Sequence, residues 1–184
     1  MKKTLIILAI ILIVVFAYGW SLYNNMVTAS ENVDNQWAQV ETQYQRRFDL
    51  IPNLVESVKG IMAQEQEVFG KIAEARTRYA GAATPSDKAG AATGMESALA
   101  RLLVVMENYP ELKSAENVQT LMAQLEGTEN RVSVERKRYN DAAREFNVMV
   151  KRVPAKWFAN IFGFGPKNYF EAVEGSETAP TVNF

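Results

Sequence analysis

The chain has 184 residues, a net charge of −1 and an isoelectric point of about 5.7, so it carries no overall charge that would attract nucleic acid. It contains no cysteine and no histidine, which excludes disulfides and thiolate nucleophiles and removes the usual component of catalytic triads, zinc sites and di-iron sites. An enzyme of this composition would have to use carboxylates, lysines, hydroxyls or a bound cofactor. We therefore expect a non-enzymatic protein without a cofactor or metal.

The N-terminal region predicts a membrane anchor. No charge appears between Lys3 and Glu31, and the apolar core from Leu5 to Leu22 would span about 27 Å as a helix, close to the thickness of the hydrocarbon layer. A cleaved signal peptide has a similar basic start and apolar core, but no small-residue cleavage site follows Phe16. Aromatic side chains typical of a membrane interface gather at the far end of the core, at Tyr18, Trp20 and Tyr23.

From residue 33 onward, apolar residues recur every three or four positions, which is typical of helices that pack against one another. No stretch alternates with a period of two, so the sequence predicts an all-α protein. Two interleaved rows run through the first part of the body: Trp37, Tyr44, Ile51, Val58, Glu65, Ile72 and Tyr79, and Val33, Val40, Arg47, Leu54, Ile61, Val68 and Ala75. Two more follow near the C-terminus: Val118, Leu125, Val132, Tyr139, Phe146 and Val153, and Leu121, Thr128, Glu135, Ala142 and Met149.

Pro52 interrupts the first pair of rows, within the stretch QRRFDLIPNLVE. A proline inside a helix costs about 3 kcal/mol because it removes a hydrogen bond and clashes with the preceding turn. Either the helix kinks there, as the unbroken heptad register favours, or the chain turns at residues 49–51 and Pro52 begins a new helix. The turn would give helices of about 22, 28, 22 and 38 residues that alternate in direction, so we expect the turn.

Other breaks divide the rest of the body. Thr84 and Pro85 offer a helix cap and a first-turn proline, Pro110 breaks the chain, Ser114 is a candidate cap for the last long helix, and Pro154 closes that helix. We therefore expect an N-terminal transmembrane helix followed by an up-and-down, antiparallel four-helix bundle. The expected domains are a transmembrane anchor at residues 1–27, the bundle at residues 28–154, and an aromatic-rich segment with a C-terminal tail at residues 155–184.

Arg47 occupies a row position that should face other helices, where an unpaired guanidinium would be costly. It should meet a carboxylate of the last long helix, and Glu129 and Glu135 are the candidates. The role of this layer is open between a pair that fixes helix alignment, an arginine whose stem lets its charge reach solvent, and a layer that binds a small ligand. The predicted polar layer consists of Arg46, Arg47, Pro52, Glu129 and Glu135.

Two segments contain more apolar side chains than one core-facing stripe can bury. Five consecutive apolar residues at positions 102–106 encircle a helix, which predicts either a central buried helix or a self-association face. The aromatic segment at residues 153–170 predicts contact with the membrane interface or another subunit, or else a loop that closes the bundle. The residues assigned to membrane or subunit contact are Leu102, Leu103, Val104, Val105, Met106, Trp157, Phe158, Phe162 and Phe164.

Three long motifs carry a resemblance to a known family: QRRFDLIPNLVESVKG, LEGTENRVSVERKRYNDAAREFN and FGFGPKNYFEAVEGSETAPTVNF. Together with YNNMV after the anchor, they resemble the LemA family over nearly the whole chain. The resemblance implies a bacterial protein with one N-terminal membrane helix and a four-helix, up-and-down bundle, and it supplies no catalytic residues. It also implies a short external N-terminus, whereas Lys2 and Lys3 favour a cytoplasmic one and a bundle outside the cytoplasm.

These observations predict a single-pass protein of the bacterial cytoplasmic membrane that acts as a self-associating scaffold or partner-binding protein. The expected partners are membrane lipids, further copies of the chain in a homo-oligomer, and other membrane proteins such as a protease, with no nucleic acid. The alternative is a small-ligand or stress-sensing module whose binding layer surrounds Arg47. An enzyme using carboxylates or lysine is the least favoured reading.

Overall fold

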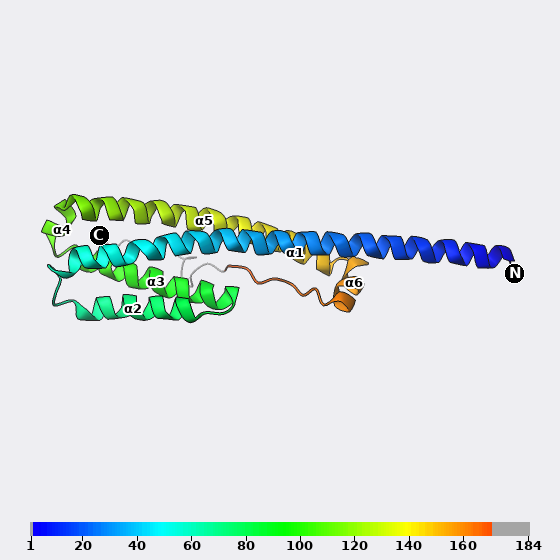
Figure 1. Cartoon of the computed structure of the whole chain (residues 1–184), viewed down its shortest axis with the longest axis horizontal. Coiled ribbons are helices and arrows are strands. Elements are labelled where there is room, and N and C mark those ends of the chain that lie inside the picture. Colours follow the sequence, from blue (N-terminus) through cyan, green and yellow to red (C-terminus); the bar gives the residue numbers. More distant parts are fainter. Residues whose placement is uncertain (1, 171–184) are drawn as a thin grey trace, which may run out of the picture.

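A computed structural model describes residues 2–170, and these residues form helices and no strand (Figure 1). The predicted all-α fold is confirmed. The helices are α1 (Lys2–Lys59), α2 (Gln66–Gly81), α3 (Pro85–Met106), α4 (Pro110–Ser114), α5 (Glu116–Lys151) and α6 (Ala155–Phe162). Residues 171–184, which complete the predicted C-terminal tail, lie outside the described part of the chain.

The long helices alternate in direction, as the up-and-down topology requires (Figure 1). α5 packs along α1, and α2 packs along α3, so the bundle consists of two antiparallel pairs. The short α4 joins α3 to α5 at one end, and α6 folds back against α1 and α5 at the other. The first part of α1 extends beyond the bundle at the α6 end.

That projecting part of α1 carries the predicted anchor. Every large apolar side chain from Leu5 to Phe16 is at least 55 % exposed, and an 18-residue window of α1 reaches a mean hydropathy of 2.7. α3 also contains a window long and apolar enough to cross a membrane, but its mean hydropathy is 1.2 and much of it is buried, as expected for a core helix. α1 passes residues 27 and 28, the expected domain boundary, without interruption.

The turn expected at residues 49–51 is wrong, because α1 continues through Pro52 to Lys59 and the chain turns at residues 60–65. Ile51 and Leu54, on either side of the proline, are almost completely buried, and burial of such side chains offsets the one hydrogen bond that proline removes. The true end carries an ordinary stop pattern, with Lys59 in the last turn and Gly60 after it. Consequently α2 has only 16 residues.

The helix starts and the core follow the sequence with three exceptions. Thr84 caps α3, and its Oγ1 accepts a hydrogen bond from the backbone N–H of Asp87 at 3.1 Å. Ser114 does not cap α5, because its hydroxyl donates to the Glu111 carbonyl within α4 at 3.0 Å and Ala115 precedes α5 without a side-chain cap. The apolar rows are largely buried, but Ile61, beyond the end of α1, is 44 % exposed and Val153, beyond the end of α5, is 64 % exposed.

Candidate functional site: an anchor-proximal clasp and a buried polar layer

A layer of charged side chains crosses the bundle interior about halfway along its length. Arg47 of α1 is 7 % exposed, and its Nη1 donates a hydrogen bond to Glu129 of α5. The same Nη1 lies 3.7 Å from Oε1 of Glu96 on α3. One arginine thereby contacts carboxylates from two other helices. We call Tyr44, Arg47, Glu96, Glu129 and Arg136 the polar layer.

Arg136 of α5 completes this layer. Its Nη2 forms an ion pair with Oε1 of Glu96, and its Nε donates to the hydroxyl of Tyr44 at 2.8 Å. The layer thus joins α1, α3 and α5 and contains two guanidinium groups and two carboxylates. Balanced charge is what a partly desolvated network needs, because a buried charge without a partner is expensive.

Burial shapes the protonation behaviour of this layer. The pKa of Glu96 is raised, chiefly because burial disfavours its charged form, and Arg136 and Arg47 oppose the rise while Glu129 adds to it. Burial also raises the pKa of the Tyr44 hydroxyl to about 12, although the Arg136 guanidinium pulls the other way. Tyr44 therefore stays neutral at physiological pH and accepts from Arg136 through its oxygen.

Of the five residues that the sequence assigned to a polar layer, only Arg47 and Glu129 come together. Of the two expected partners of Arg47, the structure brings Glu129 to it and leaves Glu135 bound to Arg138 at 2.8 Å, three residues along α5. Glu135 is wrong as a partner of Arg47: Glu129 takes that position, and one oxygen of Glu135 binds Arg138 of its own helix. Arg46 is exposed, and Pro52 lies more than a turn further along α1.

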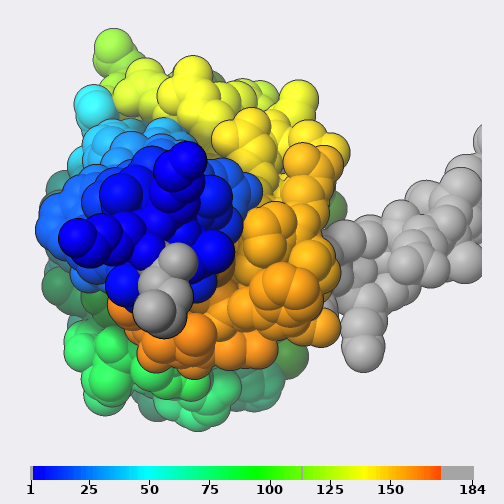
Figure 2. Space-filling view, turned by 90° about the vertical axis from the view of Figure 1, so that its right-hand side faces the viewer, coloured from blue at the N-terminus to red at the C-terminus, as the bar shows by residue number. Residues whose placement is uncertain are grey.

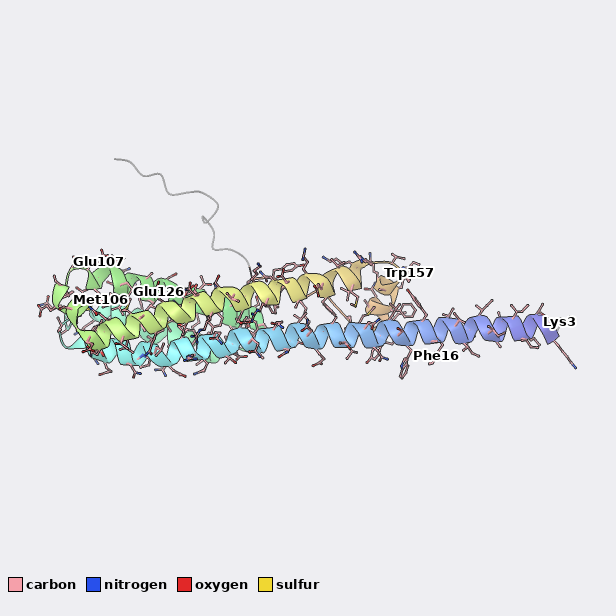
Figure 3. All side chains as sticks on the ribbon, turned by 90° about the horizontal axis from the view of Figure 1, so that it is seen from above. Lys3, Phe16, Met106, Glu107, Glu126 and Trp157 are labelled. Atoms are coloured by element: carbon pink, nitrogen blue, oxygen red, sulfur yellow. The ribbon has the colours of Figure 1, made fainter. Side chains whose placement is uncertain are left out.

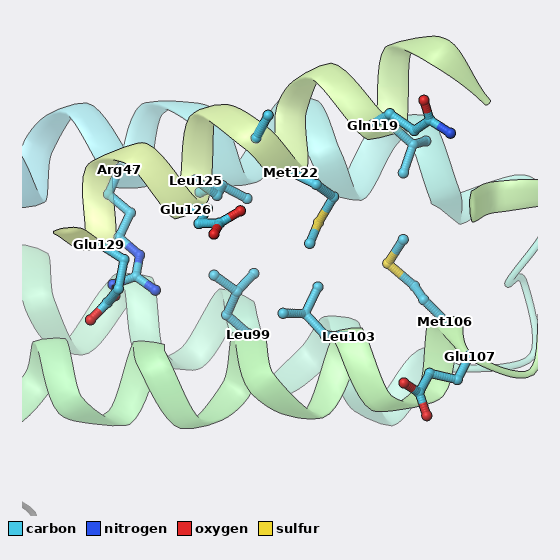
Figure 4. Close-up of a pocket in the computed structure, with 12 residues that line it drawn as sticks. Arg47, Leu99, Leu103, Met106, Glu107, Gln119, Met122, Leu125, Glu126 and Glu129 are labelled. Atoms are coloured by element: carbon cyan, nitrogen blue, oxygen red, sulfur yellow. The ribbon is translucent and has the colours of Figure 1, made fainter. Parts of the chain in front are cut away.

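A groove opens beside the polar layer, between α3 and α5 (Figure 4). Its volume is about 690 Å³, and Arg47 and Glu129 line one end of it. α3 packs along α2, and α5 packs along α1. α3 and α5 therefore form the two sides of the groove (Figure 4). The apolar side chains of its walls are Leu99, Leu103, Met106, Val118, Met122, Ala123 and Leu125.

At the opposite end of the bundle, α6 packs against the end of the apolar segment of α1. A Cβ atom added to Gly19 would lie 2.9 Å from Cε1 of Phe158, so glycine is what permits this close approach. Tyr23 packs edge-on against Phe162 with ring centroids 5.0 Å apart, and lies 5.9 Å from the ring of Phe164. We call this contact between α6 and residues 19–23 the clasp. Figure 2, viewed towards the N-terminal end, shows α6 and the following segment lying against α1.

The outer face of α6 remains uncovered. Trp157 is 61 % exposed and Ile161, one helical turn later, is 75 % exposed. Trp157 lies near the level of Phe16 of the anchor, far from Met106 and Glu107 at the other end of the bundle (Figure 3). The segment from 102 to 106 behaves differently, since Leu102 and Met106 are core residues and only Val104 is strongly exposed. An apolar face at the level of the anchor is what a protein segment at a membrane interface presents.

Residues 163–170, which we call the strap, run from α6 back along α5 (Figure 1). The side-chain amide of Asn147 donates to the Lys167 carbonyl at 2.8 Å and accepts from the Lys167 N–H at 2.7 Å. Asn140 holds Phe170 in the same two-bond manner, at 3.0 and 2.8 Å. The ring of Phe170 then stacks on Trp37 with centroids 5.5 Å apart.

Sequence reasoning missed Glu96, Arg136 and the two asparagines. A signal existed for the asparagines, which lie seven residues apart beside the aromatic row of α5, because short amides at heptad spacing can bind an extended chain. For Glu96 and Arg136 the single sequence offers no such signal. Their positions depend on how α3 lies relative to α5.

The fold and the site define an all-α protein whose first helix carries an exposed apolar segment and continues into a bundle crossed by buried ion pairs. The sequence model of the LemA family matches residues 36–184, and the chain belongs to the LemA family. Over 182 residues it is 29 % identical to the magnetosome proteins MamQ 1 and MamQ 2 of Paramagnetospirillum magneticum. It is 28 % identical to the magnetosome protein MamQ of Magnetospirillum gryphiswaldense, and each match covers 85 % of this chain and 67 % of the relative.

Proposed function

We propose that this protein is a membrane-anchored, non-enzymatic bundle that acts at the bacterial cell envelope by associating with further copies of itself or with a protein partner. The observation that carries the proposal is the continuity of α1. One helix of 58 residues, α1, contains the exposed apolar segment and continues as a helix of the bundle. Because no flexible linker separates the two parts, the bundle has a set orientation relative to the bilayer, as a scaffold needs.

The clasp supports the same proposal. In the clasp, α6 packs against α1 where α1 would leave the hydrocarbon layer. Trp157 and Ile161 of α6 point outward at the same level along α1. Tryptophan is favoured at membrane interfaces because its ring is apolar while its N–H can remain hydrated. The outer face of α6 therefore supplies contact with lipid or with the clasp of a neighbouring copy.

The relatives support the membrane setting of this proposal. Their names place them at the magnetosome and assign them no reaction. The composition of this chain points the same way, because the absence of histidine and cysteine removes the commonest acid–base and nucleophilic groups. We propose that the present chain likewise acts at a membrane, by association.

The test is the mass of the full-length protein in mild detergent, compared with that of a variant carrying Trp157→Ser and Ile161→Ser. Val104→Ser is the matched control, because Val104 is equally exposed but lies on α3. A discrete assembly that dissociates only in the α6 variant supports self-association. Monomers in all three proteins exclude self-association through the outer face of α6. Truncation at residue 28 is a poorer test, because it would also remove the Gly19 and Tyr23 contacts of α6.

A second candidate function is a small-ligand or stress-sensing module, favoured by the groove that ends at Arg47 and Glu129. A volume of about 690 Å³ lies within the range of small-molecule sites. Thermal unfolding of the full-length protein in the presence of candidate ligands discriminates between the two roles. A ligand that raises the unfolding temperature of the wild type but not of Leu103→Gln would favour the sensor.

A further inference from the structure

We infer that the groove between α3 and α5 is a docking site for a basic amphipathic helix of another protein. This inference rests on the proposed associative function and names the chemistry of one partner. The groove lies at the end of the bundle away from the anchor, as the labels of Met106, Glu107 and Glu126 show in Figure 3. A partner bound there would not compete with contacts made by α6.

The walls of the groove have the geometry that accepts a helix. Leu99, Leu103 and Met106 follow one another at helical spacing on α3, and α5 faces them with Val118, Met122 and Leu125 (Figure 4). Leu103 and Met122 are partly exposed and form the apolar surface open to a partner, whereas the other four belong to the core. Val118 and Glu129 are eleven residues apart, so the α5 wall is about 16 Å long at 1.5 Å per residue. Three turns of a helix would span that length and present apolar side chains at i, i+3 or i+4, and i+7.

A partly exposed methionine favours a helical partner further. Met122 lies on the α5 wall and is partly exposed, whereas Met106 on the α3 wall is a core residue. Methionine is unbranched and polarisable, and it adapts to the side chains of a docked helix better than leucine or isoleucine does. Gln119 and Ala123 are exposed along the edge of α5, so the groove is open to a partner approaching from solution.

Charge selects the kind of helix. Three carboxylates line the groove, those of Glu107, Glu126 and Glu129, and Arg47 is the single cationic side chain among its lining residues. The Arg47 guanidinium already contacts Glu129 and Glu96, so it does not balance the other two carboxylates. Complementary charge steers association and rejects like-charged partners, so a helix whose polar face carries lysine or arginine fits this groove.

A small ligand would contact fewer of the residues that line the groove than a helix would. A compact ligand near Arg47 would leave the carboxylate of Glu107, at the other end of the groove, without a role (Figure 4). A helix along the groove contacts both walls and places cations beside Glu107 and Glu126. The length of the groove and its acidic lining therefore favour a helix.

The experiment uses full-length protein in nanodiscs of phosphatidylcholine and a fluorescent peptide of leucine and lysine, with leucines at the i, i+3, i+4 and i+7 positions of a three- to five-turn helix. A peptide with glutamate in place of every lysine is the matched probe, and empty nanodiscs correct for lipid binding. Fluorescence anisotropy should show saturable binding of the lysine peptide and none of the glutamate peptide. Binding of both peptides, or of neither, would overturn the inference.

Substitutions locate the binding. Glu107→Lys combined with Glu126→Lys should weaken binding of the lysine peptide about tenfold or more, whereas Glu145→Lys, an exposed change elsewhere on α5, should leave it unchanged. Leu103→Gln should weaken binding, while Val104→Gln on the next position should not, because Val104 does not line the groove. Circular dichroism checks that each variant folds.

Two results would replace the helix with another occupant. If the groove holds a second copy, Leu103→Gln converts a concentration-dependent dimer into a monomer and the peptide shows no saturable binding. If it holds a small amphiphile, an apolar dye binds the wild type and the charge-reversed variant equally and displaces the peptide from both. Either result overturns this inference but leaves the test of the α6 face standing, because that test uses Trp157 and Ile161 of α6, which lies at the other end of the bundle (Figure 1).

Discussion

The two ends of this bundle join their helices differently, although an ion pair between Lys167 and Asp34 also lies at the anchor end and the rings of Phe48 and Tyr79 pack together in the other half. At the anchor end, α1, α5, α6 and the strap are joined by aromatic rings, a glycine contact and paired asparagine bonds. In the other half, the polar layer fixes three helices relative to one another, and a groove remains open beyond it. Aromatic packing tolerates contact with lipid, whereas directional ion pairs specify the alignment of helices in water. This difference motivates the proposal that the anchor end contacts the membrane and the other end binds a water-borne partner.

The largest expected effect comes from breaking the polar layer. Arg47→Met should lower the free energy of unfolding by about 2–3 kcal/mol, because Glu96 and Glu129 lose a cation, although the partial exposure of Glu129 lets water compensate in part. Thermal unfolding of the full-length protein measures this change. Arg46→Met is the control, since Arg46 is exposed and its loss should cost less than about 0.5 kcal/mol.

Hydrogen exchange distinguishes a local effect from a global one in the same variant. If the two ends are independent, Arg47→Met should accelerate exchange in α3 and in the first half of α5 but leave the strap protected. Equal acceleration at the strap would mean that the bundle unfolds as one unit, and the separation of the two ends would then be wrong.

The features that could be predicted from the sequence depend on interactions between residues close together in the chain, whereas the features that could not depend on contacts between distant helices. Periodicity predicted the apolar rows, and Thr84 with Pro85 marked the start of α3, because both signals are local. Pro52 led to the wrong prediction of a turn. The energetic cost of a proline in a helix can be read from the local sequence, whereas the burial of side chains that outweighs this cost depends on the whole bundle. The row position of Arg47 predicted a carboxylate partner. Which carboxylates it meets, Glu129 and Glu96 and not Glu135, depends on the registers of α1, α3 and α5.

The second prediction concerns the strap. Asn147→Ala removes both hydrogen bonds to Lys167, whose N–H and carbonyl then lack a side-chain partner, at a cost of about 1–2 kcal/mol. Trypsin cleaves after lysine, so limited proteolysis at Lys167 reports the opening, and the rate should rise about tenfold. Asn160→Ala, at an exposed site on α6, is the control. Unchanged cleavage would show that the rings of the strap suffice without Asn147.

The third prediction tests the clasp at Gly19. Gly19→Leu places a side chain where Phe158 packs, so α6 should be displaced from α1 at a cost of about 1 kcal/mol, moderated because the Phe158 ring can rotate away. The chain has no cysteine, so spin labels at introduced cysteines replacing Ser21 and Asn160 report only this distance. The distance distribution should broaden and lengthen in Gly19→Leu and stay narrow in Ala17→Leu. A narrow distribution in both would mean that α6 adapts in place.

The smallest expected effect is a pH dependence confined to the polar layer. Burial raises the folded-state pKa of Glu96 above its usual value of 4.5, so the folded protein retains this proton over an interval in which the unfolded chain releases it. The contribution of Glu96 to stability should therefore decrease as pH rises from about 4.5 through the raised pKa, and level off above it. The sign is opposite to that of a carboxylate whose pKa is lowered by an ion pair.

Glu96→Gln isolates this contribution because glutamine does not titrate and can still accept a hydrogen bond from Arg136. The difference in unfolding temperature, wild type minus variant, should shrink as pH rises through that interval, and this subtraction removes the titration of the other carboxylates. A difference that grows with pH would show that Arg136 and Arg47 outweigh burial at Glu96. In that case the polar layer stabilises the bundle through charge attraction. The predicted sign corresponds to a layer that is costly to bury and serves to align α1, α3 and α5.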